Sequence, residues 1–112
     1  MENVGIDIVE IERIKKALEN RRFVERVLSE EEIEKFDGFK EHRQIEFLAG
    51  RFAAKEAIIK CLSDHEIPSM SKLNITNNDK GKPEIEYKDY KILLSISHER
   101  DYAVAIAMLE GE

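Results

Sequence analysis

The amino-acid sequence predicts an α+β fold, in which an N-terminal strand and several helices pack on a largely antiparallel sheet. A helical period governs residues 10–63, whereas short alternating segments separated by turn residues fill residues 73–109. The chain has 112 residues, of which 42% are apolar. Because that length suits one hydrophobic core, we expect a single domain spanning residues 1–112.

Charge and composition exclude several classes of protein. A formal net charge of −6 disfavours general nucleic-acid binding, which relies on neutralising phosphates. No run approaches the ~18 apolar residues of a membrane span, and the N-terminus lacks a basic region followed by an apolar one. We therefore expect a cytoplasmic protein that binds neither nucleic acid nor membrane. The single cysteine, Cys61, excludes an intrachain disulfide framework.

The first element is a short strand over residues 4–9, because apolar residues alternate along it from Val4. Asp7 interrupts this strand, and aspartate is unfavourable in strand interiors. A local backbone bond, a salt bridge or a metal ion would each account for it. Gly5 lies on the same face and would let another backbone or a ligand approach closely.

Residues 10–20 form an amphipathic helix, and residues 21–28 continue as a helix or turn. Six cations and two anions lie between residues 13 and 26, on a chain that is otherwise acidic. Such a cluster indicates either a specific anionic partner or a solvated helix face. We call it the basic cluster, and its cations are Arg13, Lys15, Lys16, Arg21, Arg22 and Arg26.

A third helix begins at Ser29, which can cap it, while Glu32 completes a capping box. Three acidic residues in that first turn suit the helix dipole, so the cluster 30–32 is interpreted as structural. Asp37 and Gly38 end this helix.

A long helix follows over residues 41–63. Ile45, Leu48, Phe52 and Ile59 are spaced to share one apolar face, and Glu56 occupies the slot between the last two. A carboxylate on an apolar face is costly unless something pairs with it. The partner is either a cation of the same helix, such as Lys60 one turn further on, or a metal ion.

After a loop over residues 64–72, four strands are predicted. Residues 73–76 and 83–87 form a hairpin around the turn 77–82, and strands follow at 90–97 and 102–109. Three alanines, Ala103, Ala105 and Ala107, share one face of the last strand. They would allow a helix to pack closely against the sheet, or would contribute to an interface between subunits.

Four motifs, taken together and in order, resemble the holo-[acyl-carrier-protein] synthases, the short bacterial 4′-phosphopantetheinyl transferases. They begin with Val4-Gly5-Ile6-Asp7-Ile8-Val9 and continue with Phe47-Leu48-Ala49-Gly50-Arg51-Phe52-Ala53-Ala54-Lys55-Glu56-Ala57-Ile58-Ile59-Lys60, Gly81-Lys82-Pro83 and Ser95-Ile96-Ser97-His98. The resemblance covers nearly the whole chain. It implies the 4′-phosphopantetheinyl transferase fold.

The activity that this resemblance implies is transfer of 4′-phosphopantetheine from coenzyme A to a serine of acyl carrier protein, with release of adenosine 3′,5′-bisphosphate. This reaction enables fatty acid biosynthesis. By the family's pattern Asp7 and Glu56 hold Mg²⁺ on the pyrophosphate of coenzyme A. Glu56, directly or through a water, would help to remove the serine proton, and Lys60 would stabilise or protonate the departing phosphate.

The resemblance also assigns binding residues. Contacts with coenzyme A would come from Arg51, Lys55, Gly81, Lys82, Pro83 and His98. The first helix of the family docks the acidic carrier protein, and we carry that role onto Arg13, and further onto Arg21, Arg22 and Arg26. The family is also similar in being a homotrimer with active sites between subunits.

One segment departs from the family pattern. The family carries a glycine-rich loop after the central helix, whereas residues 61–70 contain no glycine.

Two rival functions follow from the sequence. The fold could serve as a non-catalytic binding module, which the joint presence of Asp7, Glu56 and Lys60 disfavours. Alternatively the basic cluster could bind RNA, which the overall acidity and the lack of an aromatic stacking platform disfavour.

Overall fold

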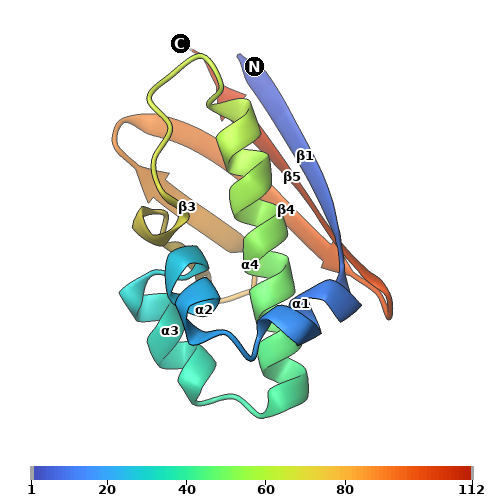
Figure 1. Cartoon of the computed structure of the whole chain (residues 1–112). Helices are drawn as coiled ribbons and strands as arrows, with labels where there is room; N and C mark the ends of the chain where they lie inside the picture. The colour runs from blue at the N-terminus through green and yellow to red at the C-terminus, as the bar shows by residue number, and fades with distance from the viewer. Residues whose placement is uncertain (1, 112) are drawn as a thin grey trace.

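A five-stranded antiparallel sheet forms one layer of the protein, and the helices form the other (Figure 1). The computed structural model describes residues 2–111. The strands are β1 (Asn3–Glu10), β2 (Ile75–Asn77), β3 (Pro83–Tyr87), β4 (Tyr90–His98) and β5 (Tyr102–Glu110), in the spatial order β1-β5-β4-β3-β2. The predicted fold class is confirmed, as is the hairpin of β2 and β3.

The helices are α1 (Ile11–Ala17), α2 (Arg21–Val27), α3 (Glu30–Asp37) and α4 (Glu41–Cys61), and a 3₁₀ turn, η1, spans Met70–Lys72. The alternation in the sequence gave no sign of η1. Asn20 separates α1 from α2, because its side chain accepts from the backbone N–H groups of Arg22 and Phe23. The predicted capping box of α3 is present, with Ser29 and Glu32 exchanging hydrogen bonds of 3.2 and 2.8 Å.

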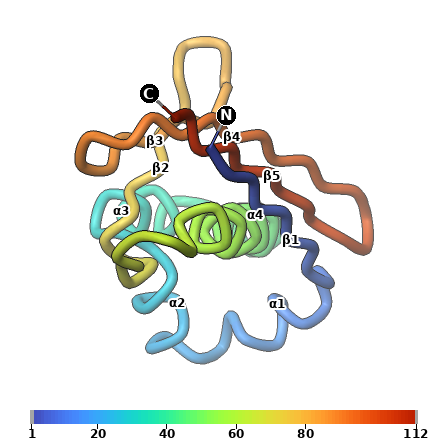
Figure 2. Tube along the Cα trace, turned by 90° about the horizontal axis from the view of Figure 1, so that it is seen from above, coloured from blue at the N-terminus to red at the C-terminus, as the bar shows by residue number. Residues whose placement is uncertain are grey.

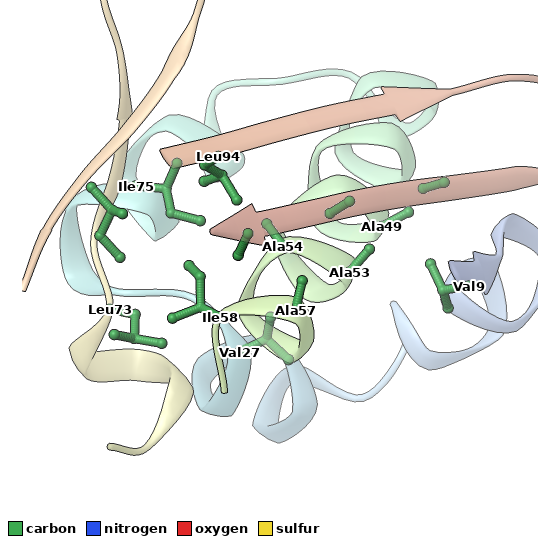
Figure 3. Packing of buried hydrophobic residues seen from close by; sticks show 14 of the residues in the cluster. Val9, Val27, Ala49, Ala53, Ala54, Ala57, Ile58, Leu73, Ile75 and Leu94 are labelled. Atoms are coloured by element: carbon green, nitrogen blue, oxygen red, sulfur yellow. The ribbon is translucent and has the colours of Figure 1, made fainter. Parts of the chain in front are cut away.

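The core lies between α4 and the central strands. Ala49, Ala53 and Ala57 of α4 are fully buried, and Figure 3 shows them in the same cluster as Ile58 and Leu94. The β5 alanines at 103, 105 and 107 are buried as well. Small side chains on both elements let the helix lie close to the sheet. The alanines therefore serve the core, and whether β5 also takes part in an interface between subunits stays a prediction.

The apolar face expected on α4 is also corrected. Phe52 and Ile59 are only half-buried, whereas the fully buried positions are distributed around most of the helix. Other elements surround α4, so no single stripe of its sequence marks the core.

Gly5 sets the distance between β1 and α4. A Cβ placed on Gly5 would lie 2.0 Å from the backbone oxygen of Ala57 and 2.9 Å from the backbone nitrogen of Cys61. Only glycine permits this approach. The close neighbour that the sequence predicted for Gly5 is therefore the backbone of α4, and Asp7 follows two residues further along the same face.

The opposite face of the sheet carries no helix (Figure 2). Large apolar side chains lie exposed there, among them Ile6 at 58% and Ile8 at 63% relative exposure. We call this surface the outer apolar face, and its members are Val4, Ile6, Ile8, Leu93 and Ile106. None of the helices in residues 2–111 is both long and apolar enough to cross a membrane.

Candidate active site

Asp7, Glu56 and Lys60 all lie where β1 meets α4. Lys60 Nζ donates to the backbone oxygen of Ile6 at 2.9 Å and lies 3.4 Å from Asp7 Oδ1. At that length the contact with Asp7 is a loose ion pair that leaves the carboxylate oxygens capacity for another partner. Of the three explanations expected for Asp7, a salt bridge is therefore observed, but it is a weak one.

Glu56 is half-buried, and its carboxylate makes neither a hydrogen bond nor a salt bridge with any residue from 2 to 111. The expected alternative of a Glu56–Lys60 pair within the helix is wrong, because Lys60 turns to β1 instead. Asp7 and Glu56, which we call the carboxylate pair, are therefore two partly buried acids with oxygens to spare. Oxygen ligands of this kind suit a hard cation such as Mg²⁺.

Within residues 2–111 no three His, Cys, Asp or Glu side chains converge to form a complete protein cage for a metal ion. That is consistent with Mg²⁺ chemistry, since Mg²⁺ is typically held by one or two carboxylates and completes its octahedron with water and substrate phosphates. The donor set of the carboxylate pair fits such an ion.

A second group of predicted residues lines a cavity of about 470 Å³ between α4 and β4. We call it the α4–β4 cavity. Four of the predicted coenzyme A contacts line it, namely Arg51, Gly81, Pro83 and His98. Gly81 has φ +83, a conformation that favours glycine in this turn. The side chain of Lys82 instead borders the neighbouring grooves along β4.

The walls of this cavity include residues that the sequence analysis did not assign, notably Lys35, Phe39, Arg43, Phe47 and Asn77. They come from α3, the connection after it, α4 and the end of β2, so no local motif unites them. With Arg51, the cations Lys35 and Arg43 outnumber the one lining carboxylate, Glu46, and make the cavity suited to an anion. A spacing signal did exist for Arg43, Phe47 and Arg51, which are four residues apart and share a face of α4.

Arg51 is held tightly at the cavity wall. Its guanidinium donates to Ile75 O at 3.3 Å and to Asn77 Oδ1 at 2.8 Å, and stacks over the Phe47 ring at 4.5 Å. Its Nε lies 3.3 Å from Glu32 Oε2. Burial lowers the pKa of Arg51 from its ordinary value, and the Glu32 carboxylate opposes that shift.

Lys55 does not reach the cavity. Its side chain is 0% exposed, pairs with Glu32, and donates to Val27 O at 2.8 Å and to Met70 O at 3.1 Å. Burial lowers its pKa, and Glu32 opposes that shift. The expectation that Lys55 contacts coenzyme A is therefore wrong for this structure, because every N–H of its ammonium group points into the core.

The carboxylate pair and the α4–β4 cavity lie on opposite flanks of α4. Asp7 pairs with Ala105 of β5, whose other neighbour is Ile96 of β4 at the cavity wall. Two strand spacings of about 4.8 Å separate Asp7 from Ile96, and α4 lies over the strand between them. Along α4, Glu56 and Arg51 are about 140° apart around the helix axis. Within one chain the carboxylate pair is therefore separated from the α4–β4 cavity.

The basic cluster divides into free and paired cations. Arg13 of α1 and Arg22 and Arg26 of α2 are exposed, and none forms a salt bridge with the part of the chain described. Arg21 instead contacts Asp37 with two hydrogen bonds of 2.7 and 3.0 Å, and lies 3.7 Å from Glu25. The hydrogen bond from Arg21 lowers the pKa of Asp37. Arg21 therefore has less free charge to offer a partner.

Side chains fix the glycine-free loop after α4. His65 Nε2 lies 2.6 Å from Glu2 Oε2, and His65 Nδ1 lies 3.2 Å from the Tyr90 hydroxyl. Lys88 reaches Glu66 at 3.3 Å. These contacts tie the loop to the residue before β1, to the turn between β3 and β4, and to the start of β4.

Comparison with known proteins gives a consistent assignment. The sequence profile of the 4′-phosphopantetheinyl transferase superfamily matches residues 3–107. The holo-[acyl-carrier-protein] synthase of a Geobacillus species is 46% identical over 112 aligned residues, covering 96% of this chain and 94% of the relative. The corresponding protein of Clostridium tetani is 45% identical and covers 97% and 95%.

Solved structures agree. A holo-(acyl-carrier-protein) synthase from Bacillus anthracis in complex with CoA (3′,5′-ADP) superposes with a TM-score of 0.90 at 41% identity, covering 99% of this chain and 97% of that one. The Helicobacter pylori synthase in complex with coenzyme A gives a TM-score of 0.82 at 30% identity, with 96% and 99% covered. The chain belongs to the 4′-phosphopantetheinyl transferase superfamily and, within it, to the group of enzymes named holo-[acyl-carrier-protein] synthases.

Proposed function

We propose that this protein transfers the 4′-phosphopantetheine group of coenzyme A to a serine of apo acyl carrier protein, and that adenosine 3′,5′-bisphosphate leaves. A bond forms between the serine oxygen and the β-phosphorus, and the bond from that phosphorus to the bridging oxygen breaks. The serine proton is taken up by a base, and the leaving phosphate retains the electron pair. The reaction belongs in the cytoplasm and supplies the holo carrier protein that fatty acid biosynthesis uses.

The observation that carries this proposal is the carboxylate pair, in a chain that belongs to this superfamily. Asp7 and Glu56 would hold Mg²⁺, since both retain free oxygens at the contact of β1 with α4. The ion, when bound, supplies positive charge to the phosphoryl oxygens. A scaffold with no use for these acids would be more stable with apolar residues in their place.

The remaining chemistry is assigned to side chains of α4. Glu56, which makes no other bond within residues 2–111, is the group that accepts the serine proton, directly or through a water. Lys60 is anchored by its bond to Ile6 O, and its ammonium is available to the leaving phosphate. Its charge offsets the negative charge that grows on that oxygen.

Coenzyme A would place its nucleotide phosphates against the α4–β4 cavity. Arg51 supplies a fixed guanidinium at the wall, and His98, Gly81 and Pro83 complete the lining. Lys82, between Gly81 and Pro83 in sequence, borders the neighbouring grooves along β4, where a flexible cation can meet a phosphate. Two relatives were solved in complex with coenzyme A or its nucleotide part, which supports coenzyme A as the ligand.

The acidic carrier protein would dock on the basic cluster. Arg13, Arg22 and Arg26 are exposed and form no salt bridge within residues 2–111, and Arg21 contributes less because Asp37 neutralises it. Exposed charges of this kind raise the association rate and make it dependent on salt. Charge reversal at Arg13 and Arg22 should therefore raise the KM for the carrier protein much more than it changes kcat.

A complete active site would require a second copy of the chain. The carboxylate pair and the α4–β4 cavity lie on opposite flanks of α4, so a single chain presents only one to a given substrate. The outer apolar face offers a contact surface between copies, since neighbouring large apolar side chains such as Ile6 and Ile8 are exposed together on it. We propose a homotrimer in which one subunit supplies the carboxylate pair and its neighbour the cavity.

Mass spectrometry of apo acyl carrier protein, incubated with the protein, coenzyme A and Mg²⁺, tests the reaction. The expected result is a mass gain of one phosphopantetheine group, abolished by a chelator and by Asp7→Asn or Glu56→Gln. Asp89→Asn is the matched control, because Asp89 lies exposed in the turn between β3 and β4. Absence of any gain, while an authentic transferase modifies the same carrier protein, would refute the proposed function.

A further inference from the structure

Glu32 is the centre of a buried network of charges that the catalytic scheme above does not use. It is 1% exposed, and its carboxylate meets two cations of α4, Lys55 and Arg51. The same carboxylate accepts backbone N–H groups from Ser29 at 2.8 Å and from Ile75 at 3.0 Å. The network therefore joins α3, α4 and β2, and it reaches the α4–β4 cavity through Arg51.

The geometry fixes the charge of each member. Lys55 Nζ contacts three acceptors, namely Val27 O, Met70 O and a Glu32 oxygen, which matches the three donors of a protonated amine. Glu32 accepts three hydrogen bonds, one of them from the Lys55 ammonium, and forms an ion pair with the Arg51 guanidinium, whose Nε–H is buried without a hydrogen-bond partner within residues 2–111; a carboxylate in these surroundings is ionised. Arg51 remains protonated in proteins. One anion and two cations leave the network with a net charge of about +1 by this count.

A buried net charge is unfavourable unless a counter-charge reaches it. Glu32 lies against both cations, but only Arg51 borders the cavity. Lys55 cannot offer its charge to a ligand directly, since it is fully buried. What Lys55 does is neutralise Glu32. Without it, the Glu32 carboxylate would cancel the charge of Arg51, and the cavity wall would be neutral at this point.

We propose that Lys55 and Glu32 are positioning residues for Arg51: Glu32 fixes the guanidinium at the cavity wall, and Lys55 offsets the Glu32 charge so that Arg51 remains available to an anionic group of the ligand. The ligand group is a phosphate of the nucleotide part of coenzyme A. This inference rests on the proposed function of the cavity. It accounts for a lysine buried beside Glu56 that contacts no substrate.

The alternative is that the network serves only to hold α3 against α4. The two roles differ in one respect. A structural role depends on how many bonds survive a substitution, whereas the electrostatic role depends on the net charge left beside Arg51. Lys55→Met removes one positive charge, so the negative charge of Glu32 and the positive charge of Arg51 then cancel each other. Adding Glu32→Gln removes the carboxylate and restores the net charge, although it removes still more of the ionic contacts.

Isothermal titration with adenosine 3′,5′-bisphosphate separates the two roles. We expect Lys55→Met to weaken binding by about tenfold or more, as loss of a nearby unit charge in partly buried surroundings predicts. Lys55→Gln, whose amide can still donate to Val27 O, should weaken binding equally. The double variant Glu32→Gln/Lys55→Met should recover most of the affinity. Lys72→Met, at an exposed lysine of η1, controls for the change in overall charge and should bind as the wild type does.

Steady-state kinetics add a second readout, in which Lys55→Met raises the KM for coenzyme A with little change in kcat. Wild-type affinity in folded Lys55→Met or Lys55→Gln would overturn the inference, as would a double variant that binds no better than Lys55→Met. If the wild-type protein does not bind adenosine 3′,5′-bisphosphate, the proposed function of the cavity fails, and this inference fails with it. Circular dichroism of each variant identifies those that fold.

Discussion

Replacement of Gly5 by alanine tests whether the contact between β1 and α4 builds the metal site. The new methyl carbon would lie 2.0 Å from Ala57 O, whereas ordinary contact begins at 3.4 Å, so the two backbones must separate by about 1.4 Å. Because the obstructing atoms belong to the backbone of a buried helix, no side-chain rotation relieves the clash. Overpacking of this kind costs about 1–3 kcal/mol, and we expect Gly5→Ala near the upper end.

The same displacement moves Asp7 away from Glu56. Mg²⁺ tolerates little deviation from its ligand distances, and a misplacement of about 1 Å at a catalytic group can lower the rate about 10²-fold. Urea unfolding measures the first effect, and transfer activity as a function of Mg²⁺ concentration measures the second. Gly38→Ala is the matched control, since a Cβ there meets Lys35 O at an ordinary 3.5 Å and φ is −87. If Gly5→Ala kept wild-type stability and metal dependence, β1 and α4 would not position the site as argued.

Three further predictions follow from particular contacts. Ser29→Ala removes the capping box of α3 and should lower the free energy of unfolding by about 0.5–2 kcal/mol in urea titrations; no change would mean that the cap is not formed in solution. The lowered pKa of Asp37 means that its pair with Arg21 stabilises the fold above the ordinary carboxyl pKa and is lost as the pH falls through the lowered value. The stability difference between wild type and Arg21→Gln should therefore be present at neutral pH and vanish in acid, and a difference that persists in acid would contradict the pair. Ile6→Lys, on the outer apolar face, should yield a folded monomer in sedimentation velocity with little transfer activity, and a trimer that survives this change would place the interface elsewhere.

Much of the fold could be predicted because its signals are local. The capping box at Ser29, the alternation of β1 and the turn before Pro83 each depend on residues close together in sequence, and each is present in the structure. The metal pair could be proposed for a related reason. Asp7 and Glu56 each violate the pattern of their own element, and such violations mark sites that need another explanation.

The parts that could not be predicted depend on contacts between distant residues. Glu32 and Lys55 are 23 positions apart, and nothing in either helix indicates that they meet. The capping box explained Glu32 fully on local grounds, which concealed its role as partner of Lys55 and Arg51. The prediction of a single buried face on α4 was wrong because other elements pack around most of the helix. The spacing of its apolar residues therefore does not mark which side is buried.

The most direct test of the account is to mix two inactive variants. Asp7→Asn removes one member of the carboxylate pair. Lys82→Glu/His98→Ala changes an exposed group beside the cavity and one at its wall, and leaves the carboxylate pair intact. If neighbouring subunits of a homotrimer share each active site, equal amounts that are unfolded and refolded together should recover about a quarter of the wild-type transfer activity, because random assembly restores both halves at that fraction of interfaces. If each chain contains a complete site of its own, the mixture will remain as inactive as its components.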